Sequence, residues 1–207
     1  MKIKRLCKLI SYGLSFVLCC QLYSSVAFAQ TKPVVQELTQ QEIQLAAYPY
    51  SAYLNVPRYA QETSHWCWAA CIQMIAAYHG LPTSQSAICQ MTFGGVIDQG
   101  AYNNSVASTL QQLIGRTCVY QTSYLSYDQV RSKIANNRTP FIIGIKWTNS
   151  NRHDVVCYGY NNVSNVYINI HDPWYVGPSS YAISYNDAIN KGNFGSGTGS
   201  WVETVSY

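Results

Sequence analysis

The chain has 207 residues, which suits one domain of ordinary size or two small lobes. Its formal net charge of +4 comes from 13 basic and 9 acidic residues, and four of the basic residues lie in the first eight positions. Without those four the chain is formally neutral, and only 11% of its residues are charged, so composition excludes a basic nucleic-acid-binding surface and a charge-rich disordered chain.

The first 29 residues have the three parts of a secretory signal peptide. Four basic residues lie among the first eight, an apolar run extends from Leu9 to Cys20, and Ala27-Phe28-Ala29 fits an A-x-A cleavage site. We predict cleavage before Gln30 and a secreted or periplasmic mature protein without stable membrane association. The alternative is an uncleaved anchor, because residues 9–29 carry no charge and are just long enough to span a bilayer.

The segment after the signal is polar, and helices follow it. Residues 30–52 are rich in glutamine, which predicts a flexible extension or a short propeptide before a domain at 53–207. Capping residues, apolar residues at helical spacing and terminating Gly or Pro predict four helices. They are expected at 64–80, at 84–91, at 105–114 and from Ser126 onward.

After Pro140 the pattern changes to strands. Short runs rich in Val, Ile and Tyr alternate with turn-forming Asn, Ser and Gly, and they predict strands at 141–147, 154–160, 166–171, 181–185 and 201–205. The connections are too short for crossover helices, so the sheet is expected to be mainly antiparallel. The predicted fold class is α+β.

Export changes the cysteine count, because the signal removes three of the eight cysteines. The remaining five are Cys67, Cys71, Cys89, Cys118 and Cys157. An odd number in an oxidising compartment suggests that one thiol is kept apart. The other four could form bridges in any of three connectivities, Cys157 could instead be a buried free thiol, and all five could simply pack in the core.

Cys67 stands out because it lies at the predicted start of the first helix, in Ser64-His65-Trp66-Cys67-Trp68. There the unpaired N–H groups and the helix dipole stabilise an anion, and a thiolate is the nucleophilic form of cysteine. Cys71 lies one turn deeper, where this effect has faded. The competing interpretation is a buried structural cysteine between two tryptophans.

A cysteine nucleophile needs a base, usually histidine, and often a third group that orients it. His65 is too close to Cys67 in the chain, and His79 lies about 18 Å down the same helix at 1.5 Å per residue. His153 and His171 lie at strand ends. A hairpin that pairs Tyr160 with Asn165 would place His153 opposite Asp172, with Cys157 opposite Ile168 on the same face. This register predicts a carboxylate–imidazole pair.

These residues resemble the active-site segments of papain-like cysteine peptidases, most closely the bacterial group that includes secreted avirulence proteases. The likeness is carried by Gln61-Glu62-Thr63-Ser64-His65-Trp66-Cys67-Trp68-Ala69-Ala70, by His153-Asp154-Val155-Val156-Cys157-Tyr158-Gly159-Tyr160 and by Asp172-Pro173-Trp174. It implies a papain-like fold, with the nucleophile on an N-terminal helical lobe and the His and Asp on a C-terminal antiparallel sheet lobe. One departure is Arg152, where relatives often have Gly before the histidine.

The resemblance also implies two supporting roles. Gln61 is expected to form an oxyanion hole with the backbone N–H of Cys67, because its amide offers a donor for negative charge on the scissile carbonyl oxygen. Trp174 is expected to shield the pair of His153 and Asp172 from water.

Together these expectations describe an exported cysteine endopeptidase that hydrolyses protein or peptide substrates through Cys67, His153 and Asp172. No metal or other cofactor is expected, because Cys67-x-x-x-Cys71 lacks a second pair of ligands at metal-binding spacing. One alternative keeps the same residues in a transglutaminase-like or amide-hydrolysing acyl transferase. Another is a non-catalytic secreted binding domain whose cysteines serve structure.

Overall fold

A computed structural model describes residues 48–174 and 179–207 of the chain. All of these residues lie in one compact unit, Leu38–Tyr207. The predicted signal peptide lies outside the described residues, as do residues 30–47 of the predicted extension. Among the described residues, no helix combines the length and the hydrophobicity needed to cross a bilayer.

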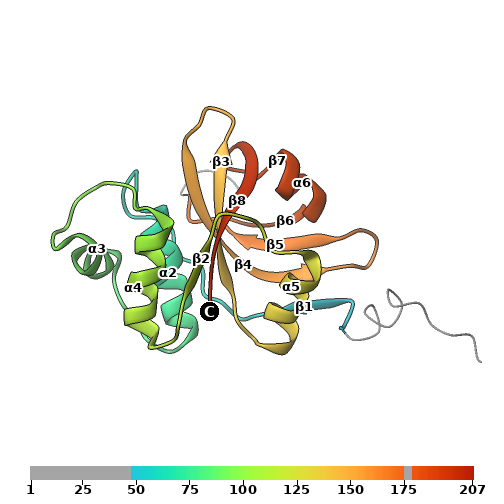
Figure 1. The fold of residues 1–207 in the computed structure, drawn as a ribbon, viewed down its shortest axis with the longest axis horizontal. Helices are drawn as coiled ribbons and strands as arrows, with labels where there is room; N and C mark the ends of the chain where they lie inside the picture. Colours follow the sequence, from blue (N-terminus) through green and yellow to red (C-terminus); the bar gives the residue numbers. More distant parts are fainter. Residues whose placement is uncertain (1–47, 175–178) are drawn as a thin grey trace, which may run out of the picture. The chain divides into compact units, whose positions relative to one another are not determined.

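Three helices form the N-terminal part of the described chain, on one side of the sheet (Figure 1): α2 (Cys67–Tyr78), α3 (Gln85–Phe93) and α4 (Asn103–Ile114). Ser84 caps α3 by accepting a hydrogen bond from the Ala87 N–H, and left-handed glycines end α3 and α4. The expected start of α2 at residue 64 was wrong, because the hydroxyl of Thr63 donates to Asp98 at 2.7 Å instead of capping the helix.

The C-terminal part is an eight-stranded sheet with the order β2-β8-β3-β4-β5-β6, in which β1 also pairs with β4 and β7 with β8. Every pairing is antiparallel, as predicted. The strands are β1 (Ser51–Tyr53), β2 (Val119–Gln121), β3 (Phe141–Trp147), β4 (Arg152–Asn161), β5 (Tyr167–His171), β6 (Ser180–Ser184), β7 (Gly192–Asn193) and β8 (Thr198–Ser206).

Several short elements were not predicted from the sequence, because their residues show little periodicity in hydrophobicity. They are β1, β2, β7 and the helix α6 (Tyr185–Asn190). Strand β1 overlaps the end of the predicted extension. The helix expected from Ser126 is present as α5 (Tyr127–Arg131), which Ser126 and Gln129 open with a capping box, and it continues as a π-helical turn, η1 (Ser132–Asn136).

The predicted register of the β4–β5 hairpin was wrong. Cys157 pairs with Ile170 rather than Ile168, and Tyr160 pairs with Ile168 rather than Asn165. The register shifts between Cys157 and Gly159, so one extra residue is accommodated there as a bulge. The hairpin therefore turns later along the chain than the sequence pattern indicated.

The core lies between the helices and the sheet, and α2 is its central element. Eight of the twelve residues of α2 are buried, including Trp68, Cys71 and Ile75. A helix that is apolar on most of its surface is buried on most sides, and α2 packs between α3, α4 and strand β4. This packing brings the first residue of α2 to the end of β4 that begins with Arg152 and His153.

Candidate active site

Cys67 is the first residue of α2 and lies in the wall of a cleft of about 970 Å³. The cleft is lined on the helical side by residues such as Ser64 and Gln99, and on the sheet side by Trp147, His153 and others. Cys67 is partly exposed, whereas Cys71 one turn below is fully buried. The cleft thus leaves a thiol at a helix N-terminus open to an incoming molecule.

His153 joins Cys67 to Asp172. Its Nε2 lies 2.7 Å from Asp172 Oδ1, and Cys67 lies near enough to affect the pKa of the ring. With Nε2 committed to the carboxylate, Nδ1 is the ring nitrogen available to the thiol. Burial of the ring lowers its pKa, but the interactions with Asp172 and Cys67 outweigh burial and raise the pKa of His153 to about 10.

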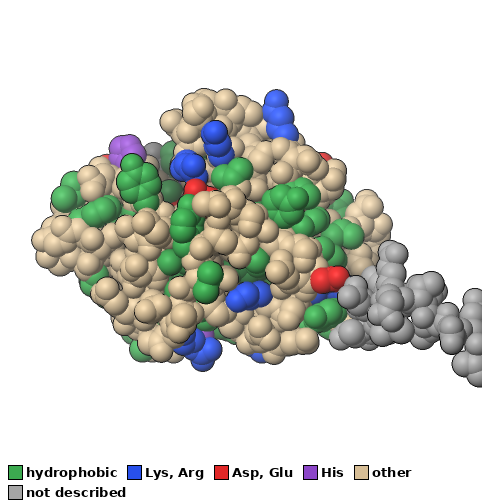
Figure 2. Space-filling model, in the orientation of Figure 1, with side chains coloured by type: hydrophobic (Ala, Val, Ile, Leu, Met, Phe, Trp, Pro, Cys, Tyr) green, Lys and Arg blue, Asp and Glu red, His purple; other side chains and the backbone are tan. Residues whose placement is uncertain are grey.

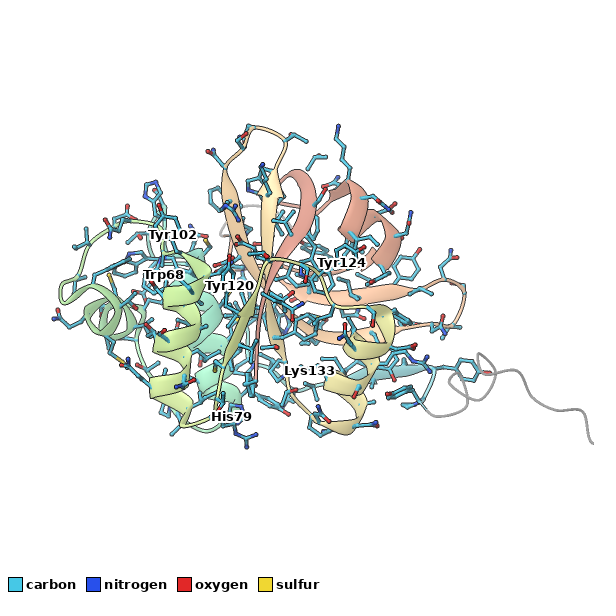
Figure 3. The ribbon with its side chains drawn as sticks, in the orientation of Figure 1. Trp68, His79, Tyr102, Tyr120, Tyr124 and Lys133 are labelled. Atoms are coloured by element: carbon cyan, nitrogen blue, oxygen red, sulfur yellow. The ribbon has the colours of Figure 1, made fainter. Side chains whose placement is uncertain are left out.

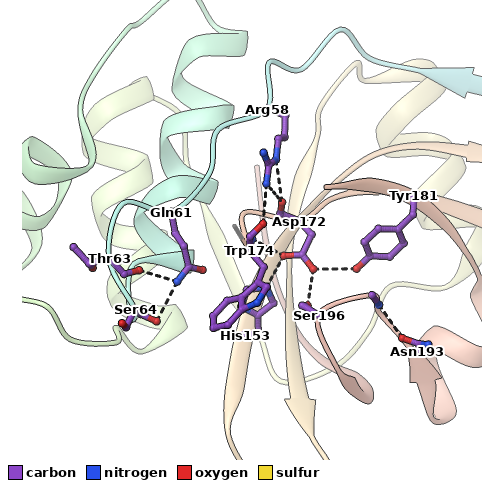
Figure 4. Close-up of polar contacts among 11 residues, drawn as sticks. Arg58, Gln61, Thr63, Ser64, His153, Asp172, Trp174, Tyr181, Asn193 and Ser196 are labelled. Carbon is purple, nitrogen blue, oxygen red and sulfur yellow. Dashed lines mark hydrogen bonds and ion pairs between the residues drawn. The ribbon is translucent and has the colours of Figure 1, made fainter. Parts of the chain in front are cut away.

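Asp172 is fully buried and accepts four hydrogen bonds from described residues. Oδ1 accepts from His153 and from the Trp174 N–H at 2.8 Å, whereas Oδ2 accepts from the hydroxyls of Tyr181 at 3.2 Å and Ser196 at 2.6 Å (Figure 4). Although burial acts to raise its pKa, these contacts with His153, Ser196 and Trp174 hold the pKa of Asp172 below its usual value. The site therefore keeps an anion next to His153.

This coupling predicts a pH dependence of folding stability. The pKa of His153 is raised from 6.5 in the free group to about 10 in the folded protein. The stabilisation from its bound proton is fully present below pH 6.5 and is lost as pH rises toward 10. We expect the urea midpoint of the wild type to fall between pH 7 and 10 more than that of His153→Gln. Equal falls in both proteins would contradict the assignment.

Two tryptophans enclose the His153 ring. Trp147 stacks on it with ring centroids 5.6 Å apart and an interplanar angle of 21°, and Trp174 meets it edge-on at 5.8 Å and 89°. Trp174 lies beside the ring, and its expected shielding role stays a prediction. Trp147 was missed because it ends strand β3, and only the pairing of β3 with β4 brings it beside His153. Its aromatic character was the one signal in the sequence.

Gln61 is buried next to the loop that precedes α2, with 4% of its surface exposed. Its Nε2 donates to the backbone oxygens of Thr63 at 2.8 Å and Ser64 at 3.0 Å, and its Oε1 has no partner (Figure 4). The amide would have to turn from these two carbonyls before it could donate to an oxyanion. The expected role of Gln61 stays a prediction.

Arg58 is a positioning residue that sequence reasoning missed. Its guanidinium donates to the backbone oxygen of Asp172 at 3.0 and 3.1 Å and to that of Trp174 at 2.9 Å (Figure 4). Three residues along, the Gln61 N–H donates to the Pro173 oxygen at 2.8 Å. These hydrogen bonds join the segment before Cys67 to the segment that carries Asp172. They hold the thiol side of the site in place relative to the carboxylate side.

We expect Arg58→Ala to lower the free energy of unfolding by about 1–3 kcal/mol, because two buried carbonyls lose a charged donor. Peptide hydrolysis is expected to fall about tenfold as Asp172 loses its fixed position. Arg58→Lys should reduce both stability and hydrolysis less than Arg58→Ala does, because an ammonium cannot bind both carbonyl oxygens as the planar guanidinium does. Urea denaturation and initial rates measure both effects. Arg116→Ala, at an exposed position, is the matched control, and equal effects of both changes would refute the positioning role.

The other histidines are engaged elsewhere. His65 pairs with Asp98 at 3.2 Å on the surface, and His79 contacts the Tyr207 hydroxyl at 2.9 Å. His171 contacts the Ser180 hydroxyl and stacks on Tyr158 with centroids 3.9 Å apart. Of these three histidines only His65 lines the cleft, and its Nδ1 already contacts Asp98.

The five cysteines of the described chain are all free thiols, so the bridges considered from the sequence are not present in the structure. Cys157 is a buried free thiol, which is the alternative favoured by its position on the inner face of β4. Burial raises the pKa of the Cys71 and Cys157 thiols, which keeps them protonated. Within the described ranges, no three His, Cys, Asp or Glu side chains gather as metal ligands.

A helix-borne cysteine facing a histidine–carboxylate pair on an antiparallel sheet, in a papain-like fold, defines the class of cysteine-type peptidases. A model of the Peptidase_C39 like family matches residues 53–206, and the chain belongs to this family. A comparison with curated proteins finds no match. The papain-like resemblance is confirmed at this level, and the closer likeness to avirulence proteases stays a prediction.

Solved structures share the fold at low sequence identity. A double glycine motif protease from an AMS/PCAT transporter, in complex with the leader peptide, is 18% identical, with a TM-score of 0.50 over 74% of this chain and 91% of that one. The Streptococcus ComA peptidase domain is 16% identical, with a TM-score of 0.50 over 76% and 96%. Prevotella intermedia interpain A is 12% identical, with a TM-score of 0.54 over 78% and 96%. These likenesses confirm the α+β papain-like fold.

Proposed function

We propose that this cysteine-type peptidase is an exported endopeptidase that hydrolyses peptide bonds through Cys67, His153 and Asp172. The observation that carries the proposal is the chain of contacts from the thiol at the start of α2, through the enclosed imidazole, to a fully buried carboxylate. A base within hydrogen-bonding reach of the nucleophile, itself oriented by a third group, is the geometry of nucleophilic catalysis.

The reaction follows from these positions. The Cys67 thiolate attacks the scissile carbonyl carbon, and the Cys67 N–H at the helix start stabilises the oxyanion. His153, which is protonated, gives its proton to the leaving amine as the C–N bond breaks and a thioester forms. The now neutral His153 takes a proton from water, which attacks the thioester, releases the acid product and regenerates the thiolate. Asp172 holds the imidazole ring in place throughout.

Two further parts of the proposal have separate support. Export is supported by the signal pattern of residues 1–29. A peptide as substrate is supported by the open cleft and by the relative whose structure contains a leader peptide. Gln61 is proposed as a second oxyanion donor, which requires its amide to turn away from the Thr63 and Ser64 carbonyls when substrate binds.

A peptide carrying a thiol-directed electrophile tests the proposal directly. We expect intact-mass and peptide mapping to place one adduct on Cys67, and His153→Ala to slow its formation strongly while the fold is retained. Cys118, partly exposed and distant in the chain, serves as the internal control for general thiol reactivity. Equal labelling of Cys67 and Cys118, or labelling of Cys67 that is independent of His153, would sink the mechanism.

A further inference from the structure

We propose that a second pocket beside Cys67 binds a cationic side chain of the peptide substrate, with lysine as the best fit. This inference rests on the proposed peptidase function and names its substrate class. The pocket has a volume of about 310 Å³, enough for one side chain, and it shares Cys67 and His153 with the main cleft. Figure 3 shows Trp68, Tyr102 and Tyr120 around this region, where the helices meet the sheet.

Two acidic residues of the pocket wall, Asp154 and Glu203, lie in one row across three neighbouring strands. Gly144 on β3 is paired with Asp154 on β4 and with Glu203 on β8, so the two carboxylates flank a position without a side chain. A Cβ at Gly144 would lie 2.5 Å from Asn103 Nδ2 and 2.9 Å from Glu203 Cβ. The glycine is therefore required for the approach of Asn103 to this row.

Asn103 supplies an acceptor that lacks a partner. Its Nδ2 donates to Glu203 Oε2 at 2.9 Å and to Asp154 Oδ1 at 3.3 Å, which fixes the orientation of the amide. Its Oδ1 is then buried with no hydrogen bond, in a residue that is only 7% exposed. A buried acceptor without a donor costs about 1–3 kcal/mol, and a donor from a bound ligand would remove that cost.

The charges in the pocket favour a cation as that donor. The pocket walls hold two carboxylates, Asp154 and Glu203, and two cationic groups, Arg152 and the protonated His153. Arg152 pairs with Glu203 at 2.6 Å and His153 pairs with Asp172 at 2.7 Å, so neither cation forms an ion pair with Asp154. Tyr120 also donates its hydroxyl to Glu203 at 2.9 Å, whereas Asp154 accepts a hydrogen bond from Asn103 at 3.3 Å and forms no ion pair with a described residue. On the face of the molecule drawn in Figure 2, Lys and Arg side chains are more prominent than Asp and Glu side chains.

Lysine matches this arrangement better than arginine does. Its ammonium carries three donors at one point and can serve one oxygen of Asn103 and one of Asp154, whereas the broad planar arginine fork suits two oxygens of one carboxylate. Burial raises the pKa of Asp154 to about 6, although the charge of His153 and the hydrogen bond from Asn103 act to lower it. A bound ammonium would supply a directly paired positive charge for Asp154 and a donor for Asn103 Oδ1.

A positional library of fluorogenic peptides with the full mature chain tests the inference. We expect one position at which lysine exceeds its neutral isostere norleucine at least tenfold in kcat/KM. Asp154→Asn should reduce this ratio to near one while cleavage of the norleucine peptide stays within about threefold. Peptides with free and blocked N-termini distinguish a lysine side chain from a terminal ammonium, and a preference for the terminal ammonium alone would overturn the assignment to a side chain.

Asp187→Asn is the matched control, because Asp187 is exposed on α6 outside the pocket, and it should leave the ratio unchanged. A purely structural role of Asp154 would lower the cleavage of both peptides equally and leave the ratio intact, which would overturn the inference. Cleavage without a basic preference at any position would overturn it while the peptidase function stands. Cleavage of no peptide in the library would overturn both.

Discussion

Replacing Cys67 by alanine is expected to abolish peptide hydrolysis, with a fall in kcat/KM of about 10⁴-fold or more. In the proposed mechanism this thiol forms the covalent bond to the substrate, and no other described cysteine lies at a helix start in the cleft. Cys71 cannot substitute, because it is fully buried one turn deeper in α2 and its thiol stays protonated. Initial rates with the best substrate of the peptide library measure the effect.

The control for this change is Cys118→Ala, which removes a partly exposed thiol far from the cleft and should keep the rate within about twofold. Thermal or urea unfolding of both variants shows whether the fold is intact. Residual hydrolysis by Cys67→Ala above about one per cent of wild type would contradict nucleophilic catalysis by this residue.

The second large effect is expected at Asp172. We expect Asp172→Ala to lower kcat/KM about 10²- to 10³-fold, because His153 loses its orienting partner and the donors of Ser196, Tyr181 and Trp174 lose a buried acceptor. Free energy of unfolding is expected to fall as well. Asp172→Ala thus removes the orientation of His153, the negative charge beside it and part of the folding stability at the same time.

Asp172→Asn separates the charge from the geometry. The amide keeps an oxygen for His153 Nε2, and the hydroxyls of Ser196 and Tyr181 can rotate to accept from its NH₂ group. The protonated imidazole loses its anionic partner, so the pKa of His153 should fall and the basic limb of the pH–rate profile should move to lower pH. A merely structural role would change rates without moving that limb, and an unmoved limb would refute electrostatic support by Asp172.

The parts of the site that sequence patterns predicted are those that depend on local chain structure. Cys67 was recognised because the helical segment after it is encoded by nearby residues, although the predicted helix start was three residues too early. The strand that carries His153 and the strand that ends just before Asp172 were evident from their β-branched residues. The contact between His153 and Asp172 is present although the register that predicted it was wrong. A bulge at Tyr158 shifts the hairpin, and the length of the buried side chains still spans the diagonal.

The parts that could not be predicted depend on contacts between distant residues. Arg58 lies 114 residues from Asp172, and nothing near Arg58 indicates where its guanidinium binds. Trp147 joins the site through the pairing of β3 with β4, and the acidic pocket requires β8 to lie beside β3. Such pairings follow from the assembled sheet, because many partners compete for any one strand before the fold is complete.

The place of β8 in the sheet has a consequence for the order of biosynthesis. This strand is the last of the described strands to leave the ribosome, yet it lies between β2 and β3 and supplies Glu203, while Ser196 just before it holds Asp172. The nucleophile is translated more than a hundred residues earlier. A nascent chain that stops short of β8 therefore holds the thiol without the completed charge network, and we expect hydrolytic capacity to arise only after this strand has been added.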